Sequence, residues 1–221
     1  MARYITPAAT TALFLVLGML AGCGMNSVNG PVSIAANSKS GDVGTVNGSV
    51  DIGEGATVED AMTVNGGVKV GARAVAKSVK TVNGEITLGE AAKVSEGVYT
   101  VNGSMSLGSG ADVAGKLGNV NGNIRLASAH VGGGIETVNG DINVGSGSRV
   151  EGGIHVEQAE STRSRLPRIV IGPGATVEGP LKFEHPVKLY VSETATVSGP
   201  IEGATAEKFA GEQPEVVEAA N

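Results

Sequence analysis

The chain has 221 residues, with 35 Gly, no Trp, three Tyr, three Phe and a formal net charge of −6. A compact globular core normally needs larger side chains, so this composition argues against one and favours a thin core of Val, Ile and Ala. The acidic balance excludes a basic nucleic-acid-binding surface. The single Cys excludes an intramolecular disulfide.

The N-terminus has the features of a bacterial lipoprotein signal. Residues 1–22 place a positive charge before the apolar stretch 11–20, which is too short to span a bilayer. The segment ends in Leu-Ala-Gly followed by Cys23, the order of a lipobox, so we expect lipidation of the Cys23 thiol and a short linker over 23–26. The alternative is an ordinary signal peptide that happens to contain a Cys. Gly24, rather than Asp, after the Cys favours the outer membrane, facing the periplasm or at the cell surface.

A Val-Asn-Gly sequence, preceded by Thr in most copies, then recurs every 18 or 19 residues. So short and regular a spacing predicts one structural unit stacked on copies of itself. The Asn of the seven copies are Asn29, Asn47, Asn65, Asn83, Asn102, Asn121 and Asn139.

Apolar residues occupy fixed positions within each unit and alternate with polar ones, as in Val50-Asp51-Ile52. This period of two predicts short strands, and Gly-containing segments between them predict corners. The predicted fold is all-β: a single-stranded β-helix, or β-solenoid, over 27–203, with about 18 residues per coil. About nine coils at the strand spacing give a rod roughly 45 Å long. The motif Val is predicted to be core and the motif Thr an outward stripe, so Val82→Asp should destabilise the fold far more than Asp51→Val.

The Asn-Gly pair has two interpretations. Gly accepts a positive φ and can turn the corner. The Asn side chains at Asn29, Asn47, Asn65, Asn83, Asn102, Asn121 and Asn139 can stack as a hydrogen-bonded ladder, as side chains do in cross-β structures. The simpler alternative is that Asn-Gly is only a good turn.

The C-terminal third is less regular. Residues 160–167 break the period and predict an exposed insertion that contains two Arg. Two degenerate coils follow, and their Phe183 and Tyr190 suit a terminal coil that covers the core. The acidic segment 204–221 lacks periodicity, and we expect most of it to be disordered.

The sequence Ile-Gly-x-Gly-Ala-x-Val-x-Gly at Ile171–Gly179 resembles the bactofilins, and the resemblance covers about 45–203. It implies a polymer-forming, right-handed β-helix of triangular section. The lipoprotein signal and the Asn-Gly repeat depart from that family. The chain is also similar to secreted bacterial β-solenoid proteins classed as adhesins. A repeat of 18 residues also equals three hexapeptides, as in the left-handed β-helix of hexapeptide acyltransferases. Left-handed coiling therefore stays open as an alternative, although the right-handed form is favoured.

Residues for catalysis are sparse. An acyltransferase would need a His as general base, and the mature chain offers His130, His155 and His185. His130 is interpreted as an exposed or corner residue. A pectate-lyase type of calcium site would need stacked Asp, and Asp51, Asp60, Asp112 and Asp141 fall in different columns. No Gly-rich phosphate loop lies between a strand and a helix. We therefore expect no enzyme activity, no cofactor and no metal.

The sequence favours a structural role, as a membrane-anchored scaffold lipoprotein. Expected partners are the membrane, through lipid on Cys23, and a second copy, through the ends of the solenoid. The alternative is an adhesin that binds cell-envelope glycan or protein, with the Thr stripe as its surface. A polysaccharide lyase or acyltransferase is a weaker alternative.

Overall fold

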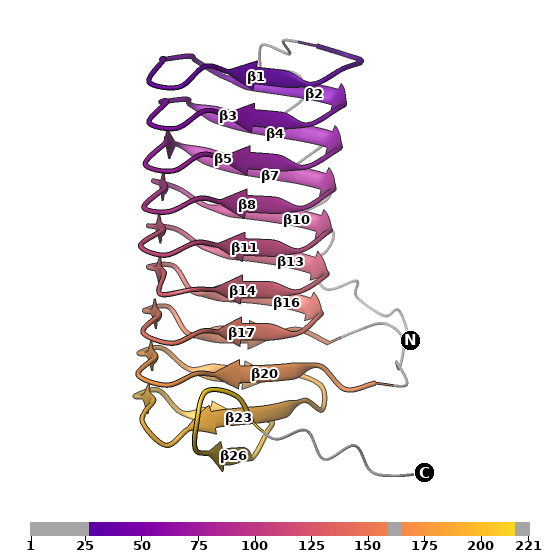
Figure 1. Cartoon of the computed structure of the whole chain (residues 1–221). Coiled ribbons are helices and arrows are strands. Elements are labelled where there is room, and N and C mark those ends of the chain that lie inside the picture. Colours follow the sequence, from indigo (N-terminus) through magenta and orange to yellow (C-terminus); the bar gives the residue numbers. More distant parts are fainter. Residues whose placement is uncertain (1–26, 159–164, 215–221) are drawn as a thin grey trace, which may run out of the picture.

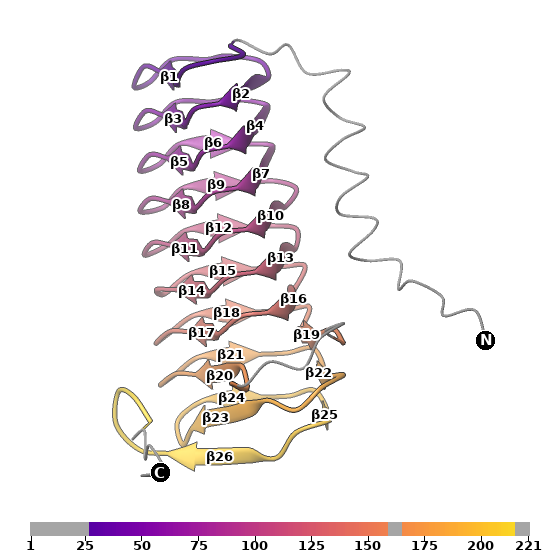
Figure 2. The same cartoon turned by 90° about the vertical axis from the view of Figure 1, so that its right-hand side faces the viewer.

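The computed structural model describes residues 27–158 and 165–214, and these residues form a β-solenoid without helices (Figures 1 and 2). Three parallel sheets run along a rod of about nine turns. Each coil passes from the ten-stranded sheet to the seven-stranded sheet and then to the nine-stranded sheet. Seen from the N-terminal end, the chain turns clockwise as it recedes, so the solenoid is right-handed (Figures 1 and 2).

The strands are short, and each sheet takes one strand from successive coils. The ten-stranded sheet contains β1 (Val32–Ile34), β3 (Val50–Ile52), β5 (Val68–Val70), β8 (Ile86–Leu88), β11 (Met105–Leu107), β14 (Ile124–Leu126), β17 (Ile142–Val144), β20 (Arg168–Ile171), β23 (Lys188–Ser192) and β26 (Ala206–Phe209). The nine-stranded sheet contains β2 (Val43–Asn47), β4 (Asp60–Asn65), β7 (Ser78–Asn83), β10 (Val98–Asn102), β13 (Leu117–Asn121), β16 (Ile135–Asn139), β19 (Ile154–Val156), β22 (Leu181–Phe183) and β25 (Ile201–Glu202). The seven-stranded sheet contains β6 (Val75–Ala76), β9 (Lys93–Val94), β12 (Asp112–Val113), β15 (His130–Val131), β18 (Arg149–Val150), β21 (Thr176–Val177) and β24 (Thr196–Val197).

The core is a set of apolar columns, because equivalent residues of successive coils pair in register. Val68, for example, lies between Val50 and Ile86 in the ten-stranded sheet. All three side chains are buried. The narrow corner next to the ten-stranded sheet is filled by Ala, as at Ala56 and Ala74. The thin aliphatic core predicted from composition is therefore confirmed.

The orientation predicted for the Thr-Val pair is wrong. Thr81 and its equivalents are buried, whereas Val82 and its equivalents are only partly covered and Val28 is 57% exposed. The alternation of β7 places Val79 and Thr81 inward, so Val82 points outward. Val82 and Ile86 are four residues apart and would share a face of a continuous strand, but the corner between them breaks the alternation. Val82→Asp therefore does not place a charge in the core.

Four of the five buried Thr, all except Thr137, donate a hydrogen bond to the corner of the preceding coil. The Oγ1 of Thr63 lies 2.8 Å from the carbonyl oxygen of Gly48, and the Oγ1 of Thr81 lies 2.9 Å from that of Gly66. Thr45 and Thr100 make the same contact, at 3.0 and 3.3 Å. A buried carbonyl that lost such a donor would carry a desolvation cost. The inward Thr thus completes the hydrogen bonding of the corner.

The corner Gly is required mainly because coils approach closely there. A Cβ built on Gly66 would overlap the carbonyl oxygen of Gly48, and one on Gly84 would overlap that of Gly66. No side chain fits unless the backbone moves. Gly66 has a φ of +156°, whereas Gly84 is not among the residues with positive φ. The positive φ predicted for this position is therefore not shared by every copy, whereas the lack of space is shared by the six copies from Gly48 to Gly140.

The solenoid extends beyond residue 203. The strand β26 pairs with β23, and Phe209 at its end is only 8% exposed. The sequence predicts that the solenoid ends at residue 203 and that most of the segment after it is disordered, but Ala206–Phe209 form the last strand of the ten-stranded sheet. The signal segment, Cys23 and most of the insertion (159–164), together with 215–221, lie outside the described residues.

The inward Thr leads to a first prediction. Thr81→Val keeps the shape of the side chain but leaves the partly buried Gly66 carbonyl without its donor, so the free energy of unfolding should fall by about 1 to 3 kcal/mol. Urea denaturation followed by circular dichroism measures the change. The matched control is Val82→Thr on the outward neighbour, for which we expect a change within about 0.5 kcal/mol. A larger loss for Val82→Thr than for Thr81→Val would contradict the assignment.

One coil departs from the Thr column, and this gives a second prediction. Asn119 donates to the carbonyl oxygens of both Gly103 and Gly122, at 3.1 and 2.8 Å. It thereby takes the acceptor that Thr137 would use, and Asn119 Oδ1 and Thr137 Oγ1 are buried without partners. Asn119→Thr should restore the column and raise the free energy of unfolding by about 1 kcal/mol. The control Asn121→Thr, on an outward Asn two residues away, should not stabilise the fold. If thermal melting places Asn119→Thr at or below the parent chain, this account of the column fails.

Candidate functional site

The seven motif Asn form a continuous ladder along one edge of the rod. Their side chains are linked by six amide hydrogen bonds of 2.9 to 3.2 Å, in which each Nδ2 donates to the Oδ1 of the preceding coil. We call these residues the Asn ladder: Asn29, Asn47, Asn65, Asn83, Asn102, Asn121 and Asn139. Because the amides bind one another, the ladder fixes the register of the coils.

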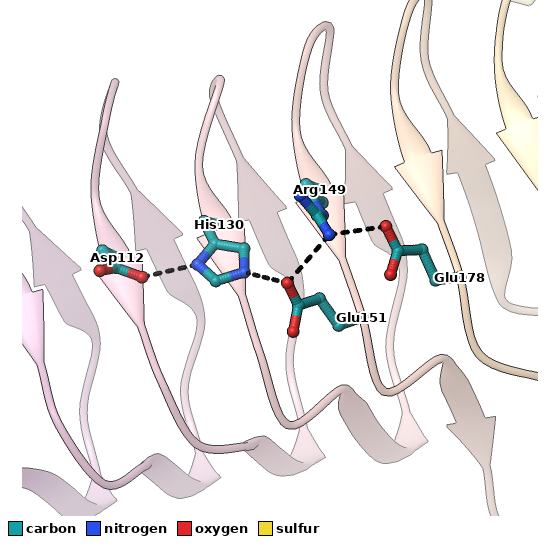
Figure 3. Close-up of polar contacts among 5 residues, drawn as sticks. All are labelled: Asp112, His130, Arg149, Glu151 and Glu178. Atoms are coloured by element: carbon teal, nitrogen blue, oxygen red, sulfur yellow. Dashed lines mark hydrogen bonds and ion pairs between the residues drawn. The ribbon is translucent and has the colours of Figure 1, made fainter.

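A second polar arrangement, the His130 cluster, lies on the outer face of the seven-stranded sheet (Figure 3). It consists of Asp112, His130, Arg149, Glu151 and Glu178. Asp112, His130 and Arg149 are register neighbours on β12, β15 and β18, and the Val that follows each of them is buried in the core. The alternation of the strands therefore directs all three charged side chains outward on successive coils.

The charges of the His130 cluster alternate along the rod axis. His130 Nδ1 lies 2.7 Å from Asp112 Oδ1, a hydrogen bond. His130 Nε2 lies 3.2 Å from Glu151 Oε1, a separation that suits an ion pair but without the geometry of a hydrogen bond. Arg149 Nη2 then contacts Glu151 at 3.2 Å and Glu178 at 2.8 Å. The network joins four coils.

The electrostatics favour a charged His130. The hydrogen bond to Asp112 is the main cause that raises the pKa of His130 above 6.5, and Glu151 adds to it while burial opposes it. A general base must be neutral near its working pH, so a raised pKa makes His130 a poor base. The imidazole instead bridges two carboxylates.

A shallow depression of about 300 Å³ lies beside the His130 cluster. Its floor is the corner next to the ten-stranded sheet, where the small residues Gly110, Ser128 and Gly147 all have φ between +49° and +69°. His130, Arg149 and Glu151 form its polar wall. Since these three side chains are already paired with one another or with neighbours, the depression offers few unused polar groups to a ligand.

The other two His lie at the base of the insertion. His155 Nε2 and Lys182 Nζ lie 3.0 and 2.9 Å from Glu184 Oε1, and the backbone N–H of Gln158 donates to Oε2 at 3.3 Å. These donors, Lys182 first, hold the pKa of Glu184 at about 2. His185 lies within hydrogen-bond distance of the carbonyl oxygens of Pro186 and Val138, at 3.1 and 3.2 Å. No sequence pattern indicates the role of Glu184, because its partners are 2 to 29 residues away along the chain and outside the repeat.

Asp141 binds the chain on the C-terminal side of the insertion. Its carboxylate accepts two hydrogen bonds from the guanidinium of Arg165 and one from the backbone N–H of Arg168. Asp141 and Glu184 therefore clamp the two chain ends between which residues 159–164 lie.

The four Asp considered for a calcium site are not brought together. Asp112 belongs to the His130 cluster, Asp141 clamps the insertion, Asp60 accepts from Ser78 Oγ at 2.6 Å, and Asp51 accepts from Ser49 Oγ at 2.9 Å. Within 27–158 and 165–214, no group of three or more His, Cys, Asp or Glu side chains is arranged to bind a metal ion. In the same part of the chain no helix is long and apolar enough to cross a membrane.

Comparison with known proteins assigns no relative. No protein-family model matches the chain, and neither a curated protein nor a solved structure is significantly similar to it.

The raised pKa of His130 leads to a third prediction. A folded pKa above the unfolded value means that the charged imidazole stabilises the fold fully below about pH 6.5, and that this contribution is lost as pH rises through the folded pKa. The stability difference between the parent chain and His130→Gln should therefore be larger at pH 5 than at pH 9. Its size should stay below about 1 kcal/mol, because the side chain is 38% exposed. Urea denaturation at both pH values measures it. A difference that grew with pH would contradict the cluster.

Proposed function

We propose that the chain is a lipoprotein whose mature part acts as a rigid, non-enzymatic structural rod in the bacterial cell envelope. Cys23 carries the lipid and lies four residues before Ser27, where the described solenoid begins. At 3.3 to 3.6 Å per residue, four residues span at most about 14 Å. The lipid would therefore hold the N-terminal coil close to the membrane, and the C-terminal coils would be the distal end of the rod.

The observation that carries this proposal is the single uninterrupted core. The ten-stranded sheet runs from β1 to β26, the nine-stranded sheet from β2 to β25 and the seven-stranded sheet from β6 to β24. The Asn ladder crosses seven coils without a gap. Parallel stacking of this kind gives a stiff element, since each coil is bonded to its neighbours along all three faces. The residues that repeat most strictly all serve this stacking.

The partners of the three His support a non-enzymatic role. His130 bridges two carboxylates, His155 binds Glu184, and His185 lies against backbone carbonyls. A general base in a solenoid acyltransferase would need an imidazole that is available to substrate. The adhesin alternative loses its expected surface, because the Thr stripe is buried.

Self-association through the ends of the rod is part of the proposal. The strand β25 is the last strand of the nine-stranded sheet, and both of its residues are exposed, with Ile201 at 37%. The strand β1 is the first of the ten-stranded sheet. Terminal strands of this kind present unpaired backbone groups to which a second copy can add.

A fourth prediction tests the proposal. The parent chain, expressed with its signal, should fractionate with membranes, and Cys23→Ser should release it, because the lipid is the only anchor invoked. The matched control Ser27→Cys in the Cys23→Ser background should not restore membrane association. Membrane association that survives Cys23→Ser would remove the lipid anchor from the proposal.

Negative-stain microscopy and light scattering of the non-lipidated chain test the rod and its assembly separately. Discrete rods or end-to-end filaments both support a structural role, whereas compact particles would contradict it. A strict monomer at high concentration would remove self-association and leave the rod.

A further inference from the structure

The Asn ladder has a chemical liability that the fold controls. In an Asn-Gly sequence the Gly nitrogen can lose its proton and attack the Asn side-chain carbon Cγ. The bond from Cγ to Nδ2 breaks, ammonia leaves, and a five-membered succinimide forms. Water then opens the ring to Asp or to isoaspartate, in which the main chain runs through the side-chain carbon. Gly favours this reaction because it has no side chain to hinder the attacking nitrogen. The chain carries seven such pairs on one edge.

Both reacting groups are restrained within the ladder. At Asn83-Gly84, the Gly84 N–H donates to the carbonyl oxygen of Asn102 at 2.9 Å, and the Asn83 Oδ1 accepts from the Asn102 side chain at 3.0 Å. Hydrogen bonds to the next coil therefore restrain both the attacking Gly84 nitrogen and the Asn83 side-chain amide that it would attack. The same backbone bond is made by Gly30, Gly48, Gly66, Gly103 and Gly122, at 2.7 to 3.0 Å.

The last pair of the ladder, Asn139-Gly140, lacks these hydrogen bonds to the next coil. Register places Gln158 above Asn139, since Thr137 pairs with Val156. The backbone N–H of Gln158 turns instead to Glu184, and the carbonyl oxygen of Val138 lies 3.2 Å from His185 Nε2. Among the described residues, the Gly140 N–H finds no acceptor and the Asn139 Oδ1 finds no donor, although Asn139 Nδ2 still donates to Asn121 at 3.2 Å.

We propose that Asn139-Gly140 is a site of spontaneous deamidation and that the other six Asn-Gly pairs are protected while the protein is folded. A protected pair reacts only after its coil opens, so its rate falls with the free energy of that local opening. At Asn139 no hydrogen bond of the next coil has to break. Each reaction replaces an amide by a carboxylate, and it adds a negative charge next to Asp141, the residue that clamps the insertion.

The experiment uses the chain without residues 1–22 and with Cys23→Ser, incubated folded at 37 °C and mildly alkaline pH, with a urea-denatured reference. Peptide mapping by mass spectrometry, with separation of the Asp and isoaspartate products, follows each pair over time. We expect all seven pairs to react in urea. In the folded chain Asn139 should react at least about ten-fold faster than Asn83, which corresponds to about 1.4 kcal/mol of protection at Asn83.

Two variants sharpen the test. Asn139→Gln should abolish the fast phase without affecting the other six pairs, because a six-membered ring closes more slowly. Asn102→Ala removes the side-chain donor above Asn83 and should raise the rate at Asn83 while the rate at Asn139 stays constant. Equal rates at all seven pairs in the folded chain would overturn the proposal, as would an Asn139 no faster than Asn83 when both react in urea.

Discussion

The carbonyl oxygen of the corner Gly is the atom on which the repeat depends. It accepts a hydrogen bond from the Oγ1 of the Thr in the following coil. It also occupies the place that a Cβ would take if the corner Gly of the following coil were any other residue. One oxygen therefore requires a donor on the inside of the corner and the absence of a side chain beside it. Thr and Gly are fixed together, and a change in either one disturbs the same atom. The Asn on the outer side adds the amide bonds that hold successive coils in register.

The same dependence shows where the stack is weakest. Asn119 satisfies two corner carbonyls at once, and the cost appears one coil later as a buried Thr137 hydroxyl without a partner. The Asn ladder ends where Gln158 takes the place of an Asn and the backbone N–H of Gln158 donates to Glu184. In both places a donor has changed its acceptor: Asn119 also donates to Gly122, and Gln158 donates to Glu184. The carbonyl groups themselves are held in place by the close stacking of the coils.

Much of this fold could be predicted from the sequence, since a repeat of constant length must place equivalent residues over one another. The three sheets, the columns of Val, Ile and Leu, and the stacking of the Asn follow from that rule alone. The facing of Thr81 and Val82 could not be predicted in the same way. Both side chains are β-branched and similar in size, and the corner interrupts the alternation that would have told them apart.

The parts outside the repeat gave weaker signals for a related reason. The strand Ala206–Phe209 has no repeat motif and is recognised only from its pairing with β23. The His130 cluster combines Asp112, His130 and Arg149 from one column with Glu151 and Glu178 from beyond the strand ends. Its members therefore share no single spacing. The sequence placed His130 at the surface but could not show which carboxylates would surround it.

The distribution of non-repeated contacts bears on where a partner would bind. A rod built only for length needs contacts that recur in every coil, and the coils up to Asn139 largely consist of these, apart from the His130 cluster. From Asp141 onward the contacts become individual: Asp141 with Arg165, Glu184 with His155, and Arg168 over the ring of Tyr190 at 5.2 Å. None of them is needed to continue a solenoid, and two of them hold the bases of the insertion. In the proposed arrangement these coils are also the farthest from the lipid. Specificity for a partner is therefore expected in the C-terminal coils, and the repeat is expected to set their distance from the membrane.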